Sequence, residues 1–399
     1  MSCRNMYYRT HQFLFCNAQK MLPWPKPRVM EGKGCLLKLP LQVKADGVNK
    51  VMVVTTAGFI RRGSLQGLFE EMDKASLEYV IYDQVKPDPV IESIEAAVTI
   101  YKKEGCQGII AVGGGSVMDC SKMVGARVVK PSQSISQMAG LLKVRKKLPP
   151  LYAVPTTAGT GSETTVAAVV TDSATHRKYA VSDTCLMPHY AVLDPALTCG
   201  LPKKLTATTG MDALTHALEA YTNKFSSQES RNYALDATKL IFENLKNACE
   251  NGGNLKYREN MLKASFYAGA AFTKAYVGYV HAIAHVIGGL YGVPHGMANA
   301  VILPVVLEEY GKGVYRELSE LAEAIGIKGS SEKERAVNFV KAIRDLNRDM
   351  GIPEFLEEIR EEDIPEIVRR ATVEANPTYP VPVIWNEEEF TKVVKKLMK

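Results

Sequence analysis

The stretch Gly108-Ile-Ile-Ala-Val-Gly113-Gly-Gly-Ser116-Val-Met-Asp119-Cys-Ser-Lys122 joins an apolar strand to a helix through three consecutive glycines. Glycines at such a junction let the backbone approach an anion closely, and the N-terminus of the helix offers free N–H groups and a partial positive charge. Asp119 falls in the first turn, where a carboxylate suits the helix dipole. The stretch matches neither Gly-x-Gly-x-x-Gly nor a Walker loop, so a tight turn without a ligand remains the alternative.

Strand and helix patterns alternate around this stretch. We predict strands at 49–55, 77–83, 108–112 and 151–154, helices at 59–76 and 90–104, and antiparallel strands at 167–172 and 178–183. A βαβαβ run of this kind predicts a parallel sheet with helices on its faces. The fourth strand leads into Pro155-Thr-Thr-Ala-Gly-Thr-Gly-Ser-Glu163, a loop rich in hydrogen-bond donors that can lie against a flat or phosphorylated ligand.

Beyond Asp194-Pro195 the strand patterns end and helical patterns dominate. We predict helices at 204–222, 228–249, 256–275, 279–290, 297–311, 314–325, 332–349 and 386–398. The sequence therefore predicts an α/β domain over residues 29–198 and an all-α domain over residues 199–399. Residues 1–28 are interpreted as an N-terminal extension packed on the body of the protein.

Three of the seven histidines fall in one short stretch of the helical half, and a fourth follows an aspartate by four residues. The group comprises Asp212, His216, His281, His285 and His295. Residues four apart project from one face of a helix, so each helix can direct its pair to one point. Three imidazoles and one carboxylate can form a site for Fe(II), Zn or Ni. The alternative for a single buried histidine, such as His285, is a hydrogen-bonded core residue.

A turn is needed to bring His295 back to the same point. We expect Pro294 and the glycines at 288, 289 and 292 to end the helix that carries His281.

The composition is that of an ordinary globular enzyme, with 46% apolar and 23% charged residues among 399. The net charge of +6 is mild, and no basic stripe interleaved with aromatic residues is present, so we expect no nucleic-acid partner. The eight cysteines contain no Cys-x-x-Cys pair and are typical of reduced thiols in the cytoplasm. No apolar run approaches the roughly 18 residues of a membrane helix.

With these motifs identified, the chain resembles the iron-containing (group III) alcohol dehydrogenase family from about Gly32 to the C-terminus. The resemblance rests on Gly113–Lys122, Pro155–Glu163, Gly210-Met-Asp-Ala-Leu-Thr-His216, and His281-Ala-Ile-Ala-His285 with Pro294-His-Gly-Met-Ala-Asn299. It implies a Rossmann-like dinucleotide-binding domain followed by a helical metal-binding domain, in a cytoplasmic homodimer. The implied activity is hydride transfer between NADP(H) or NAD(H) and a small primary alcohol or aldehyde whose oxygen is polarised by Fe(II).

The resemblance also implies roles for individual residues. Asp212, His216, His281 and His295 match the metal ligands, and His285 matches a histidine proposed to relay the proton. The cofactor loops match at Gly114, Gly115, Ser116, Thr156 and Thr157. Asp119 is placed at the nicotinamide end of the cofactor and Lys178 at the nicotinamide ribose.

Two departures from the family pattern bear on specificity. Lys274 and Tyr276 stand where many relatives have Asn and Gly, which leaves the size and polarity of the substrate pocket open. Thr56 stands where NAD-using relatives often carry Asp, and Arg61 and Arg62 follow it. Without that carboxylate the repulsion of a 2′-phosphate is absent, so we expect NADP(H) to be used at least as well as NAD(H).

Three other classes of protein fit these residues less well. A mononuclear metal hydrolase would need no dinucleotide loops, and a lyase of the dehydroquinate synthase type lacks this Asp-x-x-x-His helix followed by His-Ala-Ile-Ala-His. A binding protein without catalytic activity would not need several convergent titratable groups.

Overall fold

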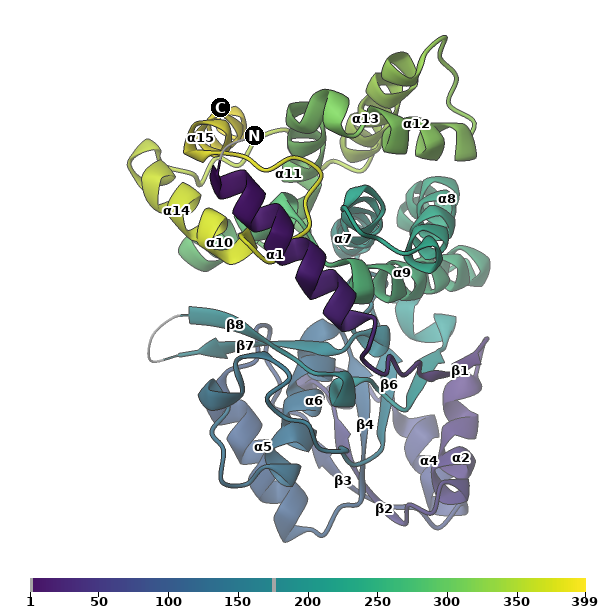
Figure 1. Ribbon diagram of the computed structural model, residues 1–399. Coiled ribbons are helices and arrows are strands. Elements are labelled where there is room, and N and C mark those ends of the chain that lie inside the picture. The colour runs from purple at the N-terminus through teal and green to yellow at the C-terminus, as the bar shows by residue number, and fades with distance from the viewer. Residues whose placement is uncertain (1–2, 174–176) are drawn as a thin grey trace. The chain divides into compact units, whose positions relative to one another are not determined.

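The structure is a computed structural model that describes residues 3–173 and 177–399, with only the backbone described for Arg177. The chain folds into two compact units, shown in Figure 1. The first is the α/β unit, Pro23–Gly200. The second is the helical unit, Leu201–Lys399 joined by the N-terminal segment that ends at Leu22.

A six-stranded sheet organises the α/β unit, and every strand pairing in it is parallel. Its order is β1 (Arg28–Glu31), β9 (Tyr190–Leu193), β6 (Leu151–Pro155), β4 (Gly108–Gly113), β2 (Lys50–Val54) and β3 (Glu78–Tyr82). A second sheet contains β5 (Gly140–Leu141), β8 (Arg177–Ser182) and β7 (Ala167–Asp172), of which β7 and β8 pair antiparallel as predicted. The predicted fold class is confirmed.

Both faces of the parallel sheet are buried. In β4, Ile109 and Ala111 pack on the side covered by α5 (Ile91–Lys103) and α6 (Gly115–Val129). Ile110 and Val112 pack on the other side, against α2 (Leu39–Ala45) and α4 (Gln66–Lys74). Because neither face meets water, the strand is apolar at every position and reads as a continuous run in the sequence.

From Leu201 onward the described part of the helical unit contains helices and no strands. They are α7 (Lys203–Thr222), α8 (Gln228–Glu250), α9 (Leu255–Ala275), α10 (Tyr279–Tyr291), α11 (His295–Tyr310), α12 (Tyr315–Ala324), α13 (Glu332–Asp349), α14 (Ile364–Ala375) and α15 (Glu387–Lys396). α14 was not predicted from the sequence.

Two predicted helices differ from the observed ones. The single helix predicted at 59–76 is wrong, because α3 (Ala57–Arg61) and α4 are separated by a turn in which Gly63 has a φ of +66°. The helix that carries His281 passes through Gly288 and Gly289 and ends only at Gly292, whose φ of +70° closes it in the left-handed region.

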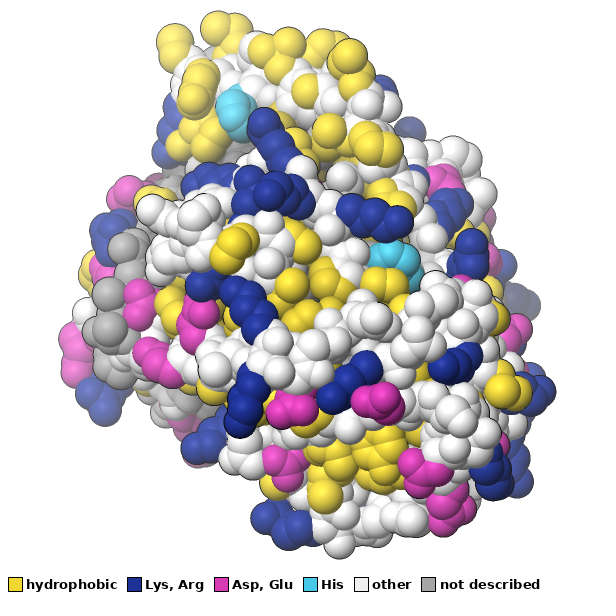
Figure 2. All heavy atoms as spheres, turned by 90° about the horizontal axis from the view of Figure 1, so that it is seen from below, with side chains coloured by type: hydrophobic (Ala, Val, Ile, Leu, Met, Phe, Trp, Pro, Cys, Tyr) yellow, Lys and Arg dark blue, Asp and Glu magenta, His cyan; other side chains and the backbone are white. Residues whose placement is uncertain are grey.

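The N-terminal segment forms α1 (Cys3–Gln19), whose polarity is the reverse of an ordinary surface helix. Its buried residues are Gln12 and Gln19, whereas Met6, Phe13 and Leu14 are more than half exposed. On the face drawn in Figure 2, hydrophobic side chains gather along the upper edge, and Lys and Arg lie among Asp and Glu over the lower half. In the described part of the chain, every helix is too short or too polar to cross a membrane.

α11 approaches α7 closely at Gly296, next to His295. A Cβ at this position would lie 2.4 Å from the backbone oxygen of Thr208, which is a distance that only a shift of the backbone can relieve. Gly289 in α10 is the matched opposite case, since a Cβ there would meet no atom within 4 Å. Gly296 therefore sets how near the two helices lie.

We predict that Gly296→Ala and Gly289→Ala change stability in opposite directions. Ala is favoured over Gly inside a helix by about 1 kcal/mol, so Gly289→Ala raises the free energy of unfolding. Gly296→Ala lowers it by about 1–3 kcal/mol, because overpacking outweighs helix propensity. Chemical denaturation of the two variants checks this, and equal stabilisation by both would show that α7 and α11 are not in tight contact.

Candidate functional site

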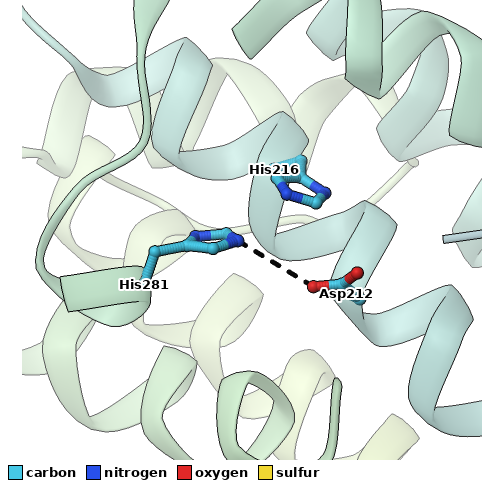
Figure 3. Close-up of side chains that lie close together, drawn as sticks. All are labelled: Asp212, His216 and His281. Atoms are coloured by element: carbon cyan, nitrogen blue, oxygen red, sulfur yellow. Dashed lines mark ion pairs between the residues drawn. The ribbon is translucent and has the colours of Figure 1, made fainter. Parts of the chain in front are cut away.

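α7 and α10 bring three candidate ligands together. Asp212 and His216 project from one face of α7, and His281 projects from the first turn of α10 toward them, as Figure 3 shows. One ligand atom from each of the three lies within 4.8 Å of the others, and all three residues are buried. His281 Nε2 lies 3.9 Å from Asp212 Oδ1. Three groups with metal-ligating atoms are thus gathered where water is scarce.

His295 joins this group from the first turn of α11. Its Nε2 lies 3.4 Å from Asp212 Oδ1. The amide of Asn299, one turn further along α11, marks the point of convergence. Asn299 Nδ2 lies 2.7 Å from Asp212 Oδ1, 3.1 Å from His295 Nε2 and 3.3 Å from His281 Nε2. Three ligand atoms from three helices therefore face one small donor.

A buried carboxylate orients His281. Glu219, on α7, contacts His281 Nδ1 through Oε2 at 2.5 Å and accepts the backbone N–H of Val280 through Oε1 at 2.8 Å. Nδ1 is thus occupied, which leaves Nε2 to face Asp212. Burial raises the pKa of Glu219 to about 8 and lowers the pKa of His281 well below its usual value. In this position the carboxylate fixes both the ring and the start of α10.

His285 lies beside this group but is held by a different partner. Its ring stacks on that of His295 with centroids 5.2 Å apart, and Nδ1 contacts Glu374 Oε1 at 2.6 Å. The Tyr379 hydroxyl donates to the same carboxylate oxygen at 3.1 Å. Nearly a third of the His285 and Glu374 side chains is exposed, so this pair reaches the protein surface.

In the α/β unit the predicted cofactor residues follow three adjacent strands. Thr56 follows β2, Gly114 and Gly115 follow β4, and Thr156 and Thr157 follow β6. Because β2, β4 and β6 are parallel neighbours, their carboxyl ends meet at one edge of the sheet, where α/β proteins bind ligands.

The two loops at this edge lie against each other. A Cβ on Gly115 would lie 2.7 Å from Thr160 Cγ2, and one on Gly114 would lie 3.2 Å from Thr157 Oγ1. Only glycine lets the loops approach this closely while α6 begins at Gly115. The result is a helix N-terminus framed by threonine hydroxyls.

Asp119 and Lys122 tie the two loops together. The prediction that Asp119 lies in the first turn of its helix is wrong, because α6 begins at Gly115 and Asp119 falls in the second turn. Asp119 accepts hydrogen bonds from Ser162 Oγ at 2.8 Å and from the Val169 backbone N–H at 3.0 Å. Lys122 is fully buried and donates to Ser162 Oγ, Thr165 Oγ1 and the Ala167 carbonyl at 2.8–2.9 Å. Burial lowers the pKa of Lys122 to about 8 and raises that of Asp119.

Three further residues singled out in the sequence are Lys178, Lys274 and Thr56. Lys178, on β8, forms an ion pair with Asp88 at 2.7 Å, and the Asp88 N–H donates to Ser116 Oγ at 3.2 Å, so Lys178 lies near the glycine loop. Lys274 is paired with Glu229 of α8 at 2.7 Å. Thr56 precedes α3, where the Arg62 guanidinium lies over the Phe59 ring, 5.1 Å from its centroid.

Three residues of the site were missed by sequence reasoning. Glu219 is three residues after His216 and Asn299 is four after His295, so helical spacing alone could have pointed to both. Glu374 gave no such signal, because the helix that carries it was not predicted and lies far from the histidines in sequence.

Comparison with known proteins is consistent with this geometry. Residues 25–195 match the model of the iron-containing alcohol dehydrogenases, and residues 206–398 match the C-terminal model of the same family. The 1,3-propanediol dehydrogenase of Klebsiella pneumoniae is 38% identical over 356 residues, covering 88% of this chain and 92% of the relative.

Two solved structures show the same fold over nearly the whole chain. A crystal structure of 1,3-propanediol oxidoreductase superimposes with a TM-score of 0.90 at 35% identity, covering 95% of this chain and 100% of the other. Sulfoacetaldehyde reductase from Bifidobacterium kashiwanohense, solved in complex with NAD+, superimposes with a TM-score of 0.85 at 29% identity. The match covers 94% of this chain and 98% of the other.

The fold and the matched models define an alcohol or aldehyde oxidoreductase. The chain belongs to the iron-containing alcohol dehydrogenase family.

The buried loop network generates a prediction about pH. Glu163 is 1% exposed, and burial raises its pKa to about 7. A folded-state pKa above the unfolded value stabilises the protein at low pH, and this stabilisation is lost as the pH rises from about 4.5 through 7. Glu163→Gln removes this loss, so the stability of the variant relative to the parent increases by about 2–3 kcal/mol between pH 5 and pH 8. Guanidinium denaturation at the two pH values measures it.

The control for this prediction is Glu78→Gln, because the Glu78 side chain is 76% exposed. The difference in unfolding free energy between Glu78→Gln and the parent should change much less between pH 5 and pH 8. A pH-independent difference for Glu163→Gln would show that Glu163 is ionised in the folded protein throughout this range.

Proposed function

We propose that the protein is a metal-dependent alcohol dehydrogenase and aldehyde reductase that binds one divalent ion through Asp212, His216, His281 and His295. The observation that carries the proposal is the convergence of Asp212, His281 and His295 on one amide nitrogen, with His216 in the same buried group. The ion is Fe(II), with Zn and Ni as alternatives. Three neutral imidazoles and one carboxylate are donors that these metals accept.

The geometry supports an ion at this point. Two ligands that each lie about 2.1 Å from one ion can be at most about 4.2 Å apart. The distances from Asp212 Oδ1 to His281 Nε2 and His295 Nε2, 3.9 and 3.4 Å, fall within that limit. Glu219 on the far nitrogen of His281 is the arrangement that commonly supports metal-bound imidazoles.

When bound, the ion supplies Lewis-acid polarisation of the substrate oxygen. The protein's own residues provide the route for the proton. In alcohol oxidation a bound nicotinamide would accept the hydride from the substrate carbon. His285 accepts the proton of the substrate hydroxyl. Since His285 Nδ1 is held by Glu374, Nε2 is the nitrogen that we assign to this transfer. The exposure of His285 and Glu374 gives the proton a path to water.

The cofactor is a nicotinamide dinucleotide bound at the carboxyl edge of the parallel sheet. NAD+ is bound by the sulfoacetaldehyde reductase of the same fold. Gly114, Gly115 and Ser116 present the N-terminus of α6 to the pyrophosphate, with Thr156 and Thr157 on the opposing loop. Asp119 holds that opposing loop through Ser162, and Lys178 is the proposed contact to the ribose of the nicotinamide.

The substrate is a small, largely uncharged primary alcohol or its aldehyde. Lys274, a cation near the site in sequence, is paired with Glu229 and so is not left to bind a carboxylate. The Phe272 ring lies on the His216 ring with centroids 4.2 Å apart, which adds an apolar wall. These neighbours favour butanal or propanal over carboxylated analogues.

We predict that metal and turnover are lost together. The parent, loaded anaerobically with Fe(II), binds about one ion per chain and oxidises reduced nicotinamide in the presence of butanal or propanal. His281→Ala/His295→Ala loses both, because two ligands are removed. Metal analysis after gel filtration and absorbance at 340 nm measure the two quantities.

His11→Ala is the control, since it removes a histidine from α1 of the same unit. It should retain about one metal ion per chain. Stoichiometric metal in the double variant would refute the ligand assignment, and a parent that binds metal but reduces no aldehyde would refute the reaction.

A second prediction concerns the cofactor, for which we propose NADP(H) use at least equal to NAD(H). Thr56 carries no charge to repel a 2′-phosphate, and its hydroxyl can donate to one. Thr56→Asp should therefore lower kcat/KM for NADPH at least tenfold relative to NADH. Steady-state kinetics with both cofactors measure the ratio, and Thr99→Asp, at an exposed position of α5, is the control. A parent that prefers NADH tenfold, or a ratio unchanged in Thr56→Asp, would show that residue 56 does not discriminate.

A further inference from the structure

α1 is bound to the helical unit by polar contacts. It precedes the residues matched by the family models, which begin at residue 25. A helix held only for stability would bury its apolar side, yet α1 buries Gln12 completely and exposes Leu14 by 62%. Burying an amide costs free energy unless it is hydrogen-bonded. The hydrogen-bond partners of Gln12 therefore indicate the role of the helix.

The middle of α1 clamps the segment that follows α14. Gln12 Nε2 donates to the Tyr379 carbonyl at 2.8 Å. Arg9 donates to the carbonyls of Val381 and Pro382 at 2.7 and 2.9 Å, and to Gln12 Oε1 at 2.8 Å. Three of the four backbone carbonyls between Tyr379 and Pro382 are thus held by two side chains one turn apart.

The end of α1 clamps the turn between α9 and α10. Gln19 donates to the Tyr276 hydroxyl, and the centroids of the Phe15 and Tyr276 rings lie 5.7 Å apart. Tyr276 ends α9 with a φ of +64°, a conformation that a tyrosine keeps only when its surroundings enforce it. Asn223, the residue that follows α7, holds the same turn by donating to the carbonyls of residues 275–277 at 3.0–3.1 Å.

The clamped segment leads to His285. The Tyr379 carbonyl is fixed by α1, and the Tyr379 hydroxyl donates to Glu374 Oε1, which contacts His285 Nδ1. Hydrogen bonds at the two ends of Tyr379, its backbone carbonyl and its hydroxyl, therefore connect Gln12 of α1 through this residue and Glu374 to the imidazole beside the candidate ligands. Figure 1 shows α1 lying across the helical unit, to which α10 and α14, the helices that carry His285 and Glu374, also belong.

We propose that α1 is a built-in positioning element of the active site: through Tyr379 and Glu374 it sets the orientation and tautomer of His285. Gln12, Tyr379 and Glu374 are positioning residues, and His285 is the catalytic residue they serve. The proposal deepens, and rests on, the proton-transfer role given to His285 in the proposed function.

The physical basis is the precision that proton transfer demands. Glu374 favours hydrogen on His285 Nδ1, which leaves Nε2 as the acceptor for the substrate proton. An error of about 1 Å in such a group costs roughly 10²-fold in rate. Glu374 is near the C-terminus of α14 and its side chain is partly exposed, so its position depends on Tyr379 and hence on α1.

The experiment compares Gln12→Glu with Asn17→Asp in the metal-loaded full-length protein. Gln12→Glu keeps the size and the contact with Arg9 but replaces the donor to the Tyr379 carbonyl with an acceptor. Asn17→Asp makes the same chemical change on the same helix, where the Asn17 side chain donates to the Phe13 carbonyl and accepts from Lys20, both close to it in sequence. Measured are kcat, KM, metal content, melting temperature and the response of kcat to added imidazole.

For Gln12→Glu we expect kcat to fall about tenfold or more, with KM, metal content and folding retained. Added imidazole should restore part of the rate, because a free base replaces a misplaced one. Asn17→Asp should match the parent. Tyr379→Phe removes only the hydroxyl bonded to Glu374 and should lower kcat in the same way. This variant replaces Gln12→Glu in the experiment if Gln12→Glu does not fold. An unchanged kcat, or a loss explained by metal loss, overturns the proposal.

A second readout does not depend on turnover. In protein labelled with ¹⁵N only at its seven histidines, we expect the His285 signal to report hydrogen on Nδ1. This signal should shift in Glu374→Gln and in Gln12→Glu but not in Asn17→Asp. If the parent reduces no aldehyde but these shifts occur, the proposed function fails while the positioning holds. Unchanged shifts in an active enzyme refute the positioning alone.

Discussion

The pair formed by Glu219 and His281 is the interaction on which the helical unit depends. Glu219 is fully buried on α7, and its two oxygens hold the Val280 N–H and His281 Nδ1. A buried carboxyl group that lost either partner would be left with an unsatisfied polar atom, which costs free energy, so the start of α10 is fixed relative to α7. A Cβ on Gly278 would lie 2.9 Å from Glu219 Oε1, which explains why the chain has glycine at this point.

One face of α7 extends this constraint in both directions. Asp212 and His216 lie on the N-terminal side of Glu219, and Asn223 lies one turn beyond it. The first two supply candidate ligands, Glu219 orients the ligand of another helix, and Asn223 closes the turn from which that helix starts. A single helix therefore builds the site and also fixes the element that completes it. α11 completes the group because Gly296 allows close approach to α7 beside His295.

Local patterns in the sequence were sufficient for the parallel sheet and most long helices. Continuous apolar runs such as 108–112 and the four-residue spacing of Asp212 and His216 depend only on strand and helix geometry. β1 and β9 were missed because each has only four residues and is stabilised by a distant partner: β1 pairs with β9, some 160 residues away. α14 was missed although its buried residues, 364, 367, 368, 371 and 375, follow helical spacing. The break between α3 and α4 depends on the backbone of Gly63, which an amphipathic pattern does not reveal.

In the candidate site, too, some features could be predicted from local patterns and others could not. Helical spacing and family motifs pointed to the histidines and to the glycine loops, whereas the partners of those side chains are a tertiary property. That His285 faces Glu374, that Lys274 is neutralised by Glu229, and that α1 is bound through glutamines all depend on residues remote in sequence.

The central claim is that α7, α10 and α11 hold one divalent ion, and anomalous diffraction tests it most directly. A crystal prepared anaerobically with Fe(II) and measured at the iron edge should give one strong peak per chain. The peak should lie within about 2.0–2.3 Å of Asp212, His216, His281 and His295. A peak at other side chains, or none at these four in crystals whose dissolved protein contains iron, would contradict the account.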